Sequence, residues 1–215
     1  MILIVGGEKG GVGKTTIATH MAVARATAGR SVVLVDADSQ GTASGWSDAR
    51  KEQPVSQVPC MSLRGGKVHV ELRELARHYD DVVVDPGGAD SQEFRSALLA
   101  ANMLLMPLKP GSFDFWTLAK MQEVIAAAQM YNDSLRVAVC LSQVPPSARD
   151  RAAKEAGTVL AEMDGFRLLN AMIGFRAAFY HCAGDGLAVS EMTNRDGKAC
   201  AEISLLHNEV FGGTQ

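Results

Sequence analysis

The feature that most constrains the fold is a loop of glycines and lysines that follows the first apolar segment. Ile2–Val5 has the character of a short buried strand, and Thr16–Ala28, which ends before Gly29, has helical spacing. The loop between them carries a phosphate-binding pattern, made of Lys9, Gly10, Gly11, Val12, Gly13, Lys14, Thr15 and Thr16. A strand, a glycine-rich loop and a helix in this order predict a P-loop domain.

The residue types in this loop suit an anionic ligand. Glycines let successive backbone N–H groups turn toward phosphate oxygens, and the start of the following helix adds a favourable dipole. Lys14 is then expected to reach the β- and γ-phosphates of a nucleotide, and the Thr15 hydroxyl to coordinate Mg²⁺. The alternative is a glycine-rich turn that binds nothing, but its place between a strand and a helix favours the nucleotide site.

Further apolar runs alternate with segments of helical spacing, and continuous apolar runs suit strands that are covered on both faces. We therefore expect an α/β fold with a mostly parallel, twisted sheet and helices on both faces, in three layers. The further expected strands are Val32–Val35, Val82–Val84, Met103–Leu108, Leu135–Leu141 and Leu168–Ile173, and the further expected helices are Val70–Tyr79, Phe113–Tyr131, Ala148–Met163 and Gly197–Val210. The irregular stretch Ser39–Gly66 is expected to be a loop with one short helix and at most one strand.

Composition limits the class of protein. The 215 residues, 47% of them apolar, fit one domain that spans residues 1–215. The four cysteines are widely spaced and are expected to be reduced, packed thiols. The apolar run at the start is too short for a signal peptide, and no segment approaches the roughly 20 apolar residues of a membrane-spanning helix. A soluble, cytoplasmic protein is expected, and its net charge of −3 means that any DNA contact needs a local basic patch.

One departure from the general P-loop pattern is informative, because Glu8 stands where that pattern expects its first glycine. The form K-G-G-x-G-K-T-T resembles the ParA/MinD family of P-loop ATPases, which have a deviant Walker A motif. The resemblance implies ATP and Mg²⁺ as ligands. It also implies a homodimer in the ATP state, in which Lys9 reaches the nucleotide that the other subunit holds. The other interpretation of Lys9 is a solvated charge beside a phosphate loop.

A pair of aspartates extends the resemblance. Asp36 and Asp38 lie in a segment similar to the family's D-x-D-P-Q sequence, with Ser39 in place of proline. The resemblance implies that Asp38 positions or activates the attacking water, and that Asp36 supports the magnesium shell or the loop; positioning of this kind dominates phosphoryl transfer. The alternative is that both aspartates only cap the next helix.

A third segment, Tyr79–Gly88, looks like a Walker B strand followed by a switch loop. On that resemblance Asp85 holds a magnesium-bound water, and Gly87 or Gly88 offers an N–H to the γ-phosphate. Gln143 ends the strand whose counterpart in the family often meets the adenine, which makes it a candidate base contact.

The resemblance implies three possible functions. The first is plasmid or DNA partition on the nucleoid, with non-specific DNA and a centromere-binding ParB/ParG-like protein as partners. The P-loop begins so near Met1 that no N-terminal helix-turn-helix domain fits, as in small ParF-like partition proteins. The second is an ATPase that positions a protein cluster or conjugation machinery. The third is a metabolic enzyme of the dethiobiotin synthetase type, which the lysine at position 9 disfavours.

Two surface features bear on the partners. Ala201–Gln215 contains no Lys or Arg, so a membrane-targeting basic helix is not expected and no membrane partner is predicted. A DNA-binding patch, if there is one, would use basic residues of the C-terminal half. They are Arg149, Arg151, Lys154, Arg167, Arg176, Arg195 and Lys198.

Overall fold

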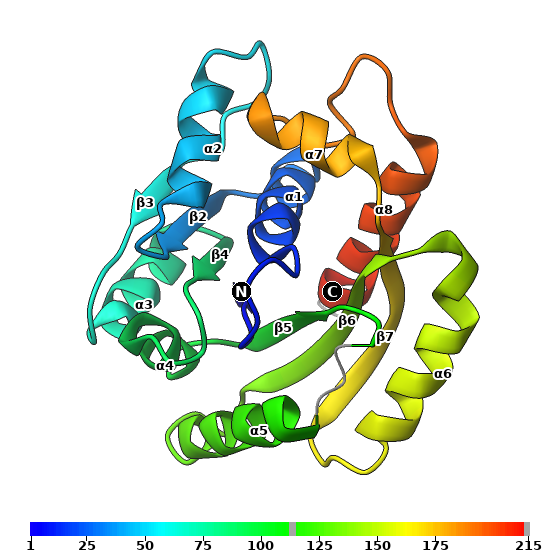
Figure 1. Cartoon of the computed structure of the whole chain (residues 1–215). Coiled ribbons are helices and arrows are strands. Elements are labelled where there is room, and N and C mark those ends of the chain that lie inside the picture. Colours follow the sequence, from blue (N-terminus) through cyan, green and yellow to red (C-terminus); the bar gives the residue numbers. More distant parts are fainter. Residues whose placement is uncertain (112–114, 213–215) are drawn as a thin grey trace.

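Seven parallel strands form the centre of the fold in the computed structural model, which describes residues 1–111 and 115–212 (Figure 1). The strand order is β3-β2-β4-β1-β5-β6-β7, and every neighbouring pair is parallel. The strands are β1 (Ile2–Val5), β2 (Val32–Ala37), β3 (Cys60–Ser62), β4 (Asp81–Pro86), β5 (Met103–Leu108), β6 (Arg136–Val144) and β7 (Phe166–Gly174). The predicted α/β class is confirmed.

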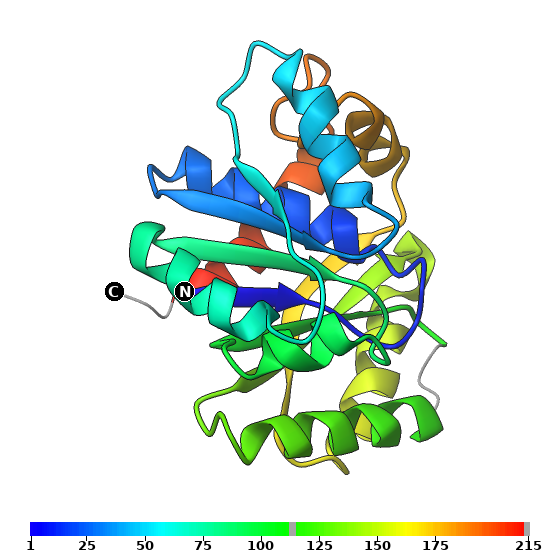
Figure 2. The ribbon, with the colours of Figure 1, turned by 90° about the vertical axis from the view of Figure 1, so that its left-hand side faces the viewer.

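Helices cover both faces of the sheet, as Figure 2 shows in side view. Alternate residues of a strand point to opposite faces, so Leu3 and Val5 of β1 enter one core while Ile2 and Ile4 enter the other. The first core is covered by α1 (Lys14–Thr27), α2 (Thr42–Lys51), α7 (Ala177–Gly184) and α8 (Gly197–Phe211), and the second by α3 (Val68–His78), α4 (Gln92–Leu98), α5 (Phe115–Gln129) and α6 (Arg149–Leu160).

The predicted elements agree with the structure apart from their ends and two helices. Each predicted strand is present, and the irregular stretch holds α2 and β3. Of the helix predicted to begin at Phe113, residues 113 and 114 lie outside the described residues, and α5 begins at Phe115. The α4 and α7 helices were not predicted from the sequence. The α4 helix is short and begins with a cap, in which the Ser91 hydroxyl accepts a hydrogen bond from the Phe94 N–H.

The topology places several loops at one edge of the sheet. Because all strands are parallel, the loops that follow β1, β2, β4, β6 and β7 emerge at the carboxyl edge, where open α/β sheets bind their ligands. All the predicted site residues except those within α1 lie in these loops or at these strand ends. In residues 1–111 and 115–212, no helix has both the length and the apolar character to cross a membrane.

A buried ion pair fixes α2 to the segment that follows α7. Arg50 of α2 is 1% exposed, and its guanidinium donates to both carboxylate oxygens of Glu191 at 2.6 and 2.8 Å. It also donates to the Gly186 carbonyl at 3.0 Å. Gly186 has a φ of +69°, and a Cβ there would lie 2.2 Å from the backbone nitrogen of Arg50. The backbone therefore approaches α2 closely enough that only glycine fits.

Candidate active site

The phosphate-binding pattern forms the predicted loop between β1 and α1. Gly11 and Gly13 both have a left-handed backbone, with φ of +68° and +92°. At Gly13 a Cβ would also lie 3.1 Å from the Ser142 hydroxyl oxygen, so conformation and space both require glycine there. Gly13 caps α1 without a side-chain hydrogen bond to its first turn. The first N–H groups of α1 are thus available to an anion.

Lys14 and Thr15 turn toward the groups that the motif predicts. The Lys14 ammonium folds back over the loop and donates to the Lys9 carbonyl at 3.2 Å. The Thr15 hydroxyl donates to Oδ2 of Asp85 at 2.6 Å, which joins the start of α1 to the end of β4. The structure therefore brings together two of the three predicted metal ligands, from positions 70 residues apart.

The environment of Asp85 suits a cation. The side chain is 2% exposed, and the pKa of its carboxyl is raised from 3.8 to about 7, chiefly by burial. The negative charges of Asp36 and Asp38 contribute to this rise, while the Thr15 hydrogen bond and the Lys14 charge oppose it. Hydroxyl and carboxylate oxygens are ligands that Mg²⁺ prefers, and a cation beside Asp85 would offset the cost of burying its charge. The residues present therefore fit Mg²⁺.

Magnesium sites in nucleotide-binding proteins commonly use one or two carboxylates and complete the shell with phosphates and water. The described ranges 1–111 and 115–212 hold no group of three or more His, Cys, Asp or Glu side chains arranged as a metal site.

Asp36 is wholly buried and is bound by backbone groups. Its Oδ1 accepts from the Asp38 N–H at 3.1 Å, and its Oδ2 accepts from the Ser44 N–H, in the first turn of α2, at 2.8 Å. These contacts give Asp36 the capping and loop-holding part of its predicted roles. Its share in a magnesium shell stays a prediction.

Asp38 is in the loop after β2, and its side chain faces the loop after β4. It is half-buried, and its Oδ1 accepts from the Gln40 N–H at 3.0 Å. A Cβ placed on Gly87 would lie 3.6 Å from the same oxygen, so the Asp38 carboxylate lies against the loop that follows β4. The structure thus brings Asp38 beside the loop that follows the strand of Asp85.

Two charged residues, Glu8 and Lys9, stand at the start of the phosphate-binding loop, and only Glu8 is in an ion pair within the described residues. Lys9 is half-buried, and its ammonium makes no hydrogen bond or ion pair with any residue in the described part of the chain. Oε1 of Glu8 accepts from Lys120 of α5 at 3.3 Å, and Lys120 also donates to Asp90 at 3.1 Å. The Glu8–Lys120–Asp90 bridge joins the P-loop to the segment after β4 and leaves Lys9 available to an outside partner.

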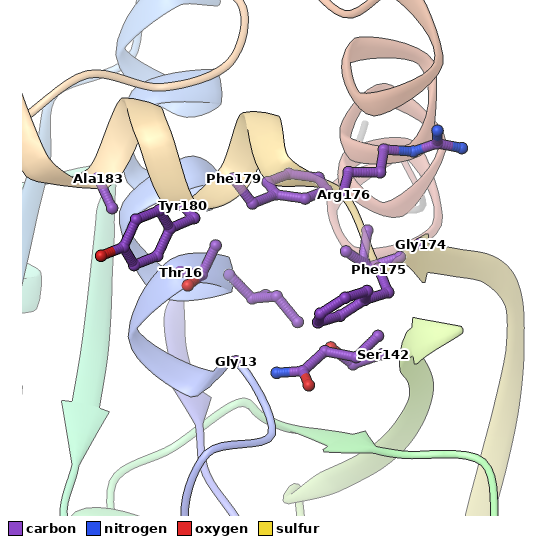
Figure 3. Close-up of a pocket in the computed structure, with 12 residues that line it drawn as sticks. Gly13, Thr16, Ser142, Gly174, Phe175, Arg176, Phe179, Tyr180 and Ala183 are labelled. Carbon is purple, nitrogen blue, oxygen red and sulfur yellow. The ribbon is translucent and has the colours of Figure 1, made fainter. Parts of the chain in front are cut away.

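A cavity of about 250 Å³ lies beside the P-loop, between α1 and α7 (Figure 3). Gln143 has a φ of +56°, and its side-chain amide donates to the Gly11 carbonyl at 2.8 Å. Phe175 and Tyr180 at the mouth are 72% and 81% exposed. Flat aromatic rings beside an amide form a suitable site for a planar heterocycle. Neither ring was predicted from the sequence, because Tyr180 lies in the unpredicted α7 and Phe175 lies in the short connection between β7 and α7.

Arg176 also lines the cavity but is engaged elsewhere. Figure 3 shows its guanidinium pointing away from the cavity toward α8, where it donates to Glu202 at 2.8 Å. Arg149 donates to the same Glu202 oxygen at 2.6 Å, and Arg151 lies 3.5 Å from Glu155. Three of the basic residues considered for DNA contact are therefore in ion pairs. The other four, all exposed, are Lys154, Arg167, Arg195 and Lys198.

Comparisons with known proteins show the family to which this chain belongs. Residues 3–189 match a family described as the CobQ/CobB/MinD/ParA nucleotide binding domain. The maintenance of carboxysome distribution protein A of Halothiobacillus neapolitanus is 31% identical, over 97% of this chain and 95% of that protein. The protein of the same name from Gloeobacter kilaueensis is 32% identical, over 88% and 84%. The ParA protein of Rhizobium radiobacter is 24% identical, over 94% and 90%.

Solved structures share the fold. McdA from Cyanothece without nucleotide superposes with a TM-score of 0.73 at 15% identity and covers 97% of this chain and 98% of that one. An ATP complex of a Cyanothece McdA variant gives 0.71 at 17% identity, over 100% and 97%. The septum site-determining protein MinD of Pyrococcus horikoshii, bound to Mg-ADP, gives 0.70 at 18% identity, over 98% and 95%.

Proposed function

Because this chain belongs to the CobQ/CobB/MinD/ParA nucleotide-binding family and is a ParA-like ATPase, we propose that it uses ATP binding and hydrolysis to position a large protein assembly in the cell. The single observation that carries this choice of cargo is the similarity, over almost the whole chain, to proteins named for carboxysome distribution. It supports the second of the three functions considered from the sequence over plasmid partition by a ParF-like protein.

We assign the nucleotide to the loop of residues 9–16 and the cavity beside it. The backbone N–H groups of Gly10 to Thr16 and the ammonium of Lys14 bind the phosphates, for which the left-handed Gly13 and the open start of α1 are suited. The base occupies the cavity between Gln143 and the exposed rings of Phe175 and Tyr180.

Thr15 and Asp85 are the residues that would hold Mg²⁺, with Asp36 fixing the neighbouring loop. The ion supplies charge neutralisation at the β- and γ-phosphates when it is bound. Asp38 orients the attacking water, and its place against the loop after β4 supports this role. Hydrolysis needs little covalent chemistry from the protein, so these groups act by position and charge.

Lys9 makes the ATP state a homodimer in this proposal. Its ammonium, free within the described residues, contacts the nucleotide of the partner subunit, while Lys14 serves its own subunit. The dimer binds nucleoid DNA through exposed basic residues, and a partner protein attached to the cargo stimulates hydrolysis and releases it.

An affinity capture experiment tests the choice of cargo. The Asp38→Ala variant, which should bind ATP without hydrolysing it, is used as bait in a lysate of the native host, with Lys9→Ala as the control that should not dimerise. Recovery of proteins of a large assembly by Asp38→Ala alone supports the proposal. Recovery of a centromere-binding protein with its DNA contradicts it and restores the partition function.

A further inference from the structure

An arginine in the irregular segment after β3 clamps the loop that carries Asp38. The Arg64 guanidinium donates through Nη1 to the carbonyl of Asp36 and through Nη2 to the carbonyl of Asp38, the latter at 2.7 Å. Nη2 also lies 3.5 Å from Oδ1 of Asp36. One rigid group therefore holds the backbone on both sides of residue 37 and the carboxylate that caps α2.

The same segment is also hydrogen-bonded to α4, the helix that follows the loop after β4. The Gly65 N–H donates to Oε1 of Glu93 at 2.7 Å, and Glu93 lies in the first turn of α4. This hydrogen bond and the nearby Arg64 charge lower the pKa of the Glu93 carboxyl. Residues 64 and 65 therefore connect the loop that carries Asp38 to the first turn of α4.

The clamp needs the geometry of arginine. Its planar, forked donors reach two carbonyls at once, whereas a lysine ammonium is a point charge on a flexible stem. The Arg64 side chain is 42% exposed, so its charge is held here without deep desolvation. Its positive charge also lies 3.5 Å from the buried carboxylate of Asp36, which it helps to stabilise.

From this geometry we propose that Arg64 is a positioning residue for ATP hydrolysis, which sets the place of the Asp38 carboxylate. The inference rests on the proposed function, because it takes Asp38 to orient the attacking water. The hydrogen bonds of Arg64 go to the carbonyls of Asp36, Leu63 and Asp38 and not to the loop of residues 9–16, so we expect its effect on turnover and not on ATP binding. Loss of the clamp lowers turnover and leaves nucleotide affinity in place.

Three variants test the clamp. Arg64→Met keeps the apolar stem and removes the donors, and Arg64→Lys keeps the charge but not the fork. Arg73→Met is the matched control, because Arg73 is exposed and donates to one backbone carbonyl, that of Leu99, at 2.8 Å away from the site. The kcat for ATP hydrolysis, the Kd for ATP and the thermal unfolding midpoint are measured for each.

We expect kcat to fall about tenfold or more in Arg64→Met, the size that losing charged hydrogen bonds implies. We expect a smaller fall in Arg64→Lys and no change in Arg73→Met. The Kd for ATP should stay near the wild-type value in all three, and the unfolding midpoint should fall by no more than a few degrees, so that each variant is folded in the assay. A kcat of Arg64→Met within twofold of wild type overturns the inference, and so does a parallel loss of ATP affinity and turnover.

The wild type and Asp38→Asn separate this inference from the proposed function. A wild-type protein that does not hydrolyse ATP, or an Asp38→Asn variant that hydrolyses it at the wild-type rate, contradicts the proposed function itself. An active wild type, an inactive Asp38→Asn and an unaffected Arg64→Met contradict the Arg64 clamp alone.

Discussion

Acid should destabilise the fold through one buried histidine in the P-loop helix. His20 is 2% exposed, and burial lowers the pKa of its imidazole from 6.5 to about 4. Nδ1 lies 2.6 Å from the Thr16 carbonyl and therefore donates to it, while Nε2 accepts from the Val189 N–H at 3.1 Å. Both nitrogens are satisfied only in the neutral ring. A proton on Nε2 would oppose the Val189 N–H and remove that hydrogen bond.

The size of the effect follows from the two pKa values. Each pKa unit corresponds to about 1.4 kcal/mol, so the difference between 6.5 and about 4 is about 3 kcal/mol of unfolding free energy. The unfolded state binds more protons between these values. The contribution of His20 is therefore fully present above pH 6.5 and is lost as the pH falls toward 4.

The total stability curve does not isolate this effect, because Asp85 acts in the opposite direction. Its pKa is raised from 3.8 to about 7 in the folded state, so its contribution favours folding at low pH and is lost as the pH rises toward 7. Subtracting the unfolding free energy of a His20 variant from that of the wild type at each pH removes the Asp85 contribution, which both proteins share. The comparison is wild type with His20→Gln, and His78→Gln at an exposed site is the control.

Urea unfolding at a series of pH values supplies the measurement. The wild type should be more stable than His20→Gln at pH 7.5, and this difference should shrink by about 3 kcal/mol by pH 4. The difference between wild type and His78→Gln should stay nearly constant. A constant difference for His20→Gln as well would show that the His20 pKa is unshifted, which would refute the reasoning.

Three further changes have definite expected results. Gly186→Ala should lower the unfolding free energy by about 2 kcal/mol or more, because the added Cβ would lie 2.2 Å from the backbone nitrogen of Arg50. The control is Gly157→Ala, in a helix with open space around the new methyl group, which should leave the unfolding free energy unchanged or raise it. Arg50→Met should cost about 3 kcal/mol or more in urea unfolding, because Glu191 loses its partner; a loss under about 1 kcal/mol would contradict this. Thr15→Val should weaken ATP binding about tenfold in calorimetry with Mg²⁺ but not with EDTA; equal weakening in both would contradict the metal role.

The parts of the site that were predicted are those whose geometry is local. The loop from Lys9 to Thr16 is contiguous, and the strand and helix on either side fix its shape, so its residues could be assigned from their order alone. The phosphate-binding motif and the family resemblance assigned Thr15 and Asp85 to one magnesium site, and the structure brings their side chains within 2.6 Å of each other.

The parts that were missed depend on contacts between distant segments. Arg64 donates to carbonyls 26 and 28 positions earlier in the chain, and this contact requires β3 to pair with β2. The three residues of β3 are half-exposed or exposed, so the sequence shows no apolar run or alternation that would predict this strand. The α7 helix is apolar over most of its eight residues and shows no polar face to mark it. Its aromatic residues at the cavity, Phe179 and Tyr180, could therefore not be placed from sequence.

The measurement that tests the account most directly is molar mass by light scattering in ADP and in a non-hydrolysable ATP analogue with Mg²⁺. Wild type and Lys9→Ala are compared, with Lys51→Ala, an exposed lysine paired with Asp48, as the control. The account predicts a dimer only with the ATP analogue, for wild type and Lys51→Ala, and a monomer for Lys9→Ala in every condition. A wild-type monomer with the analogue, or a dimer that survives Lys9→Ala, would contradict the proposed ATP-dependent switch.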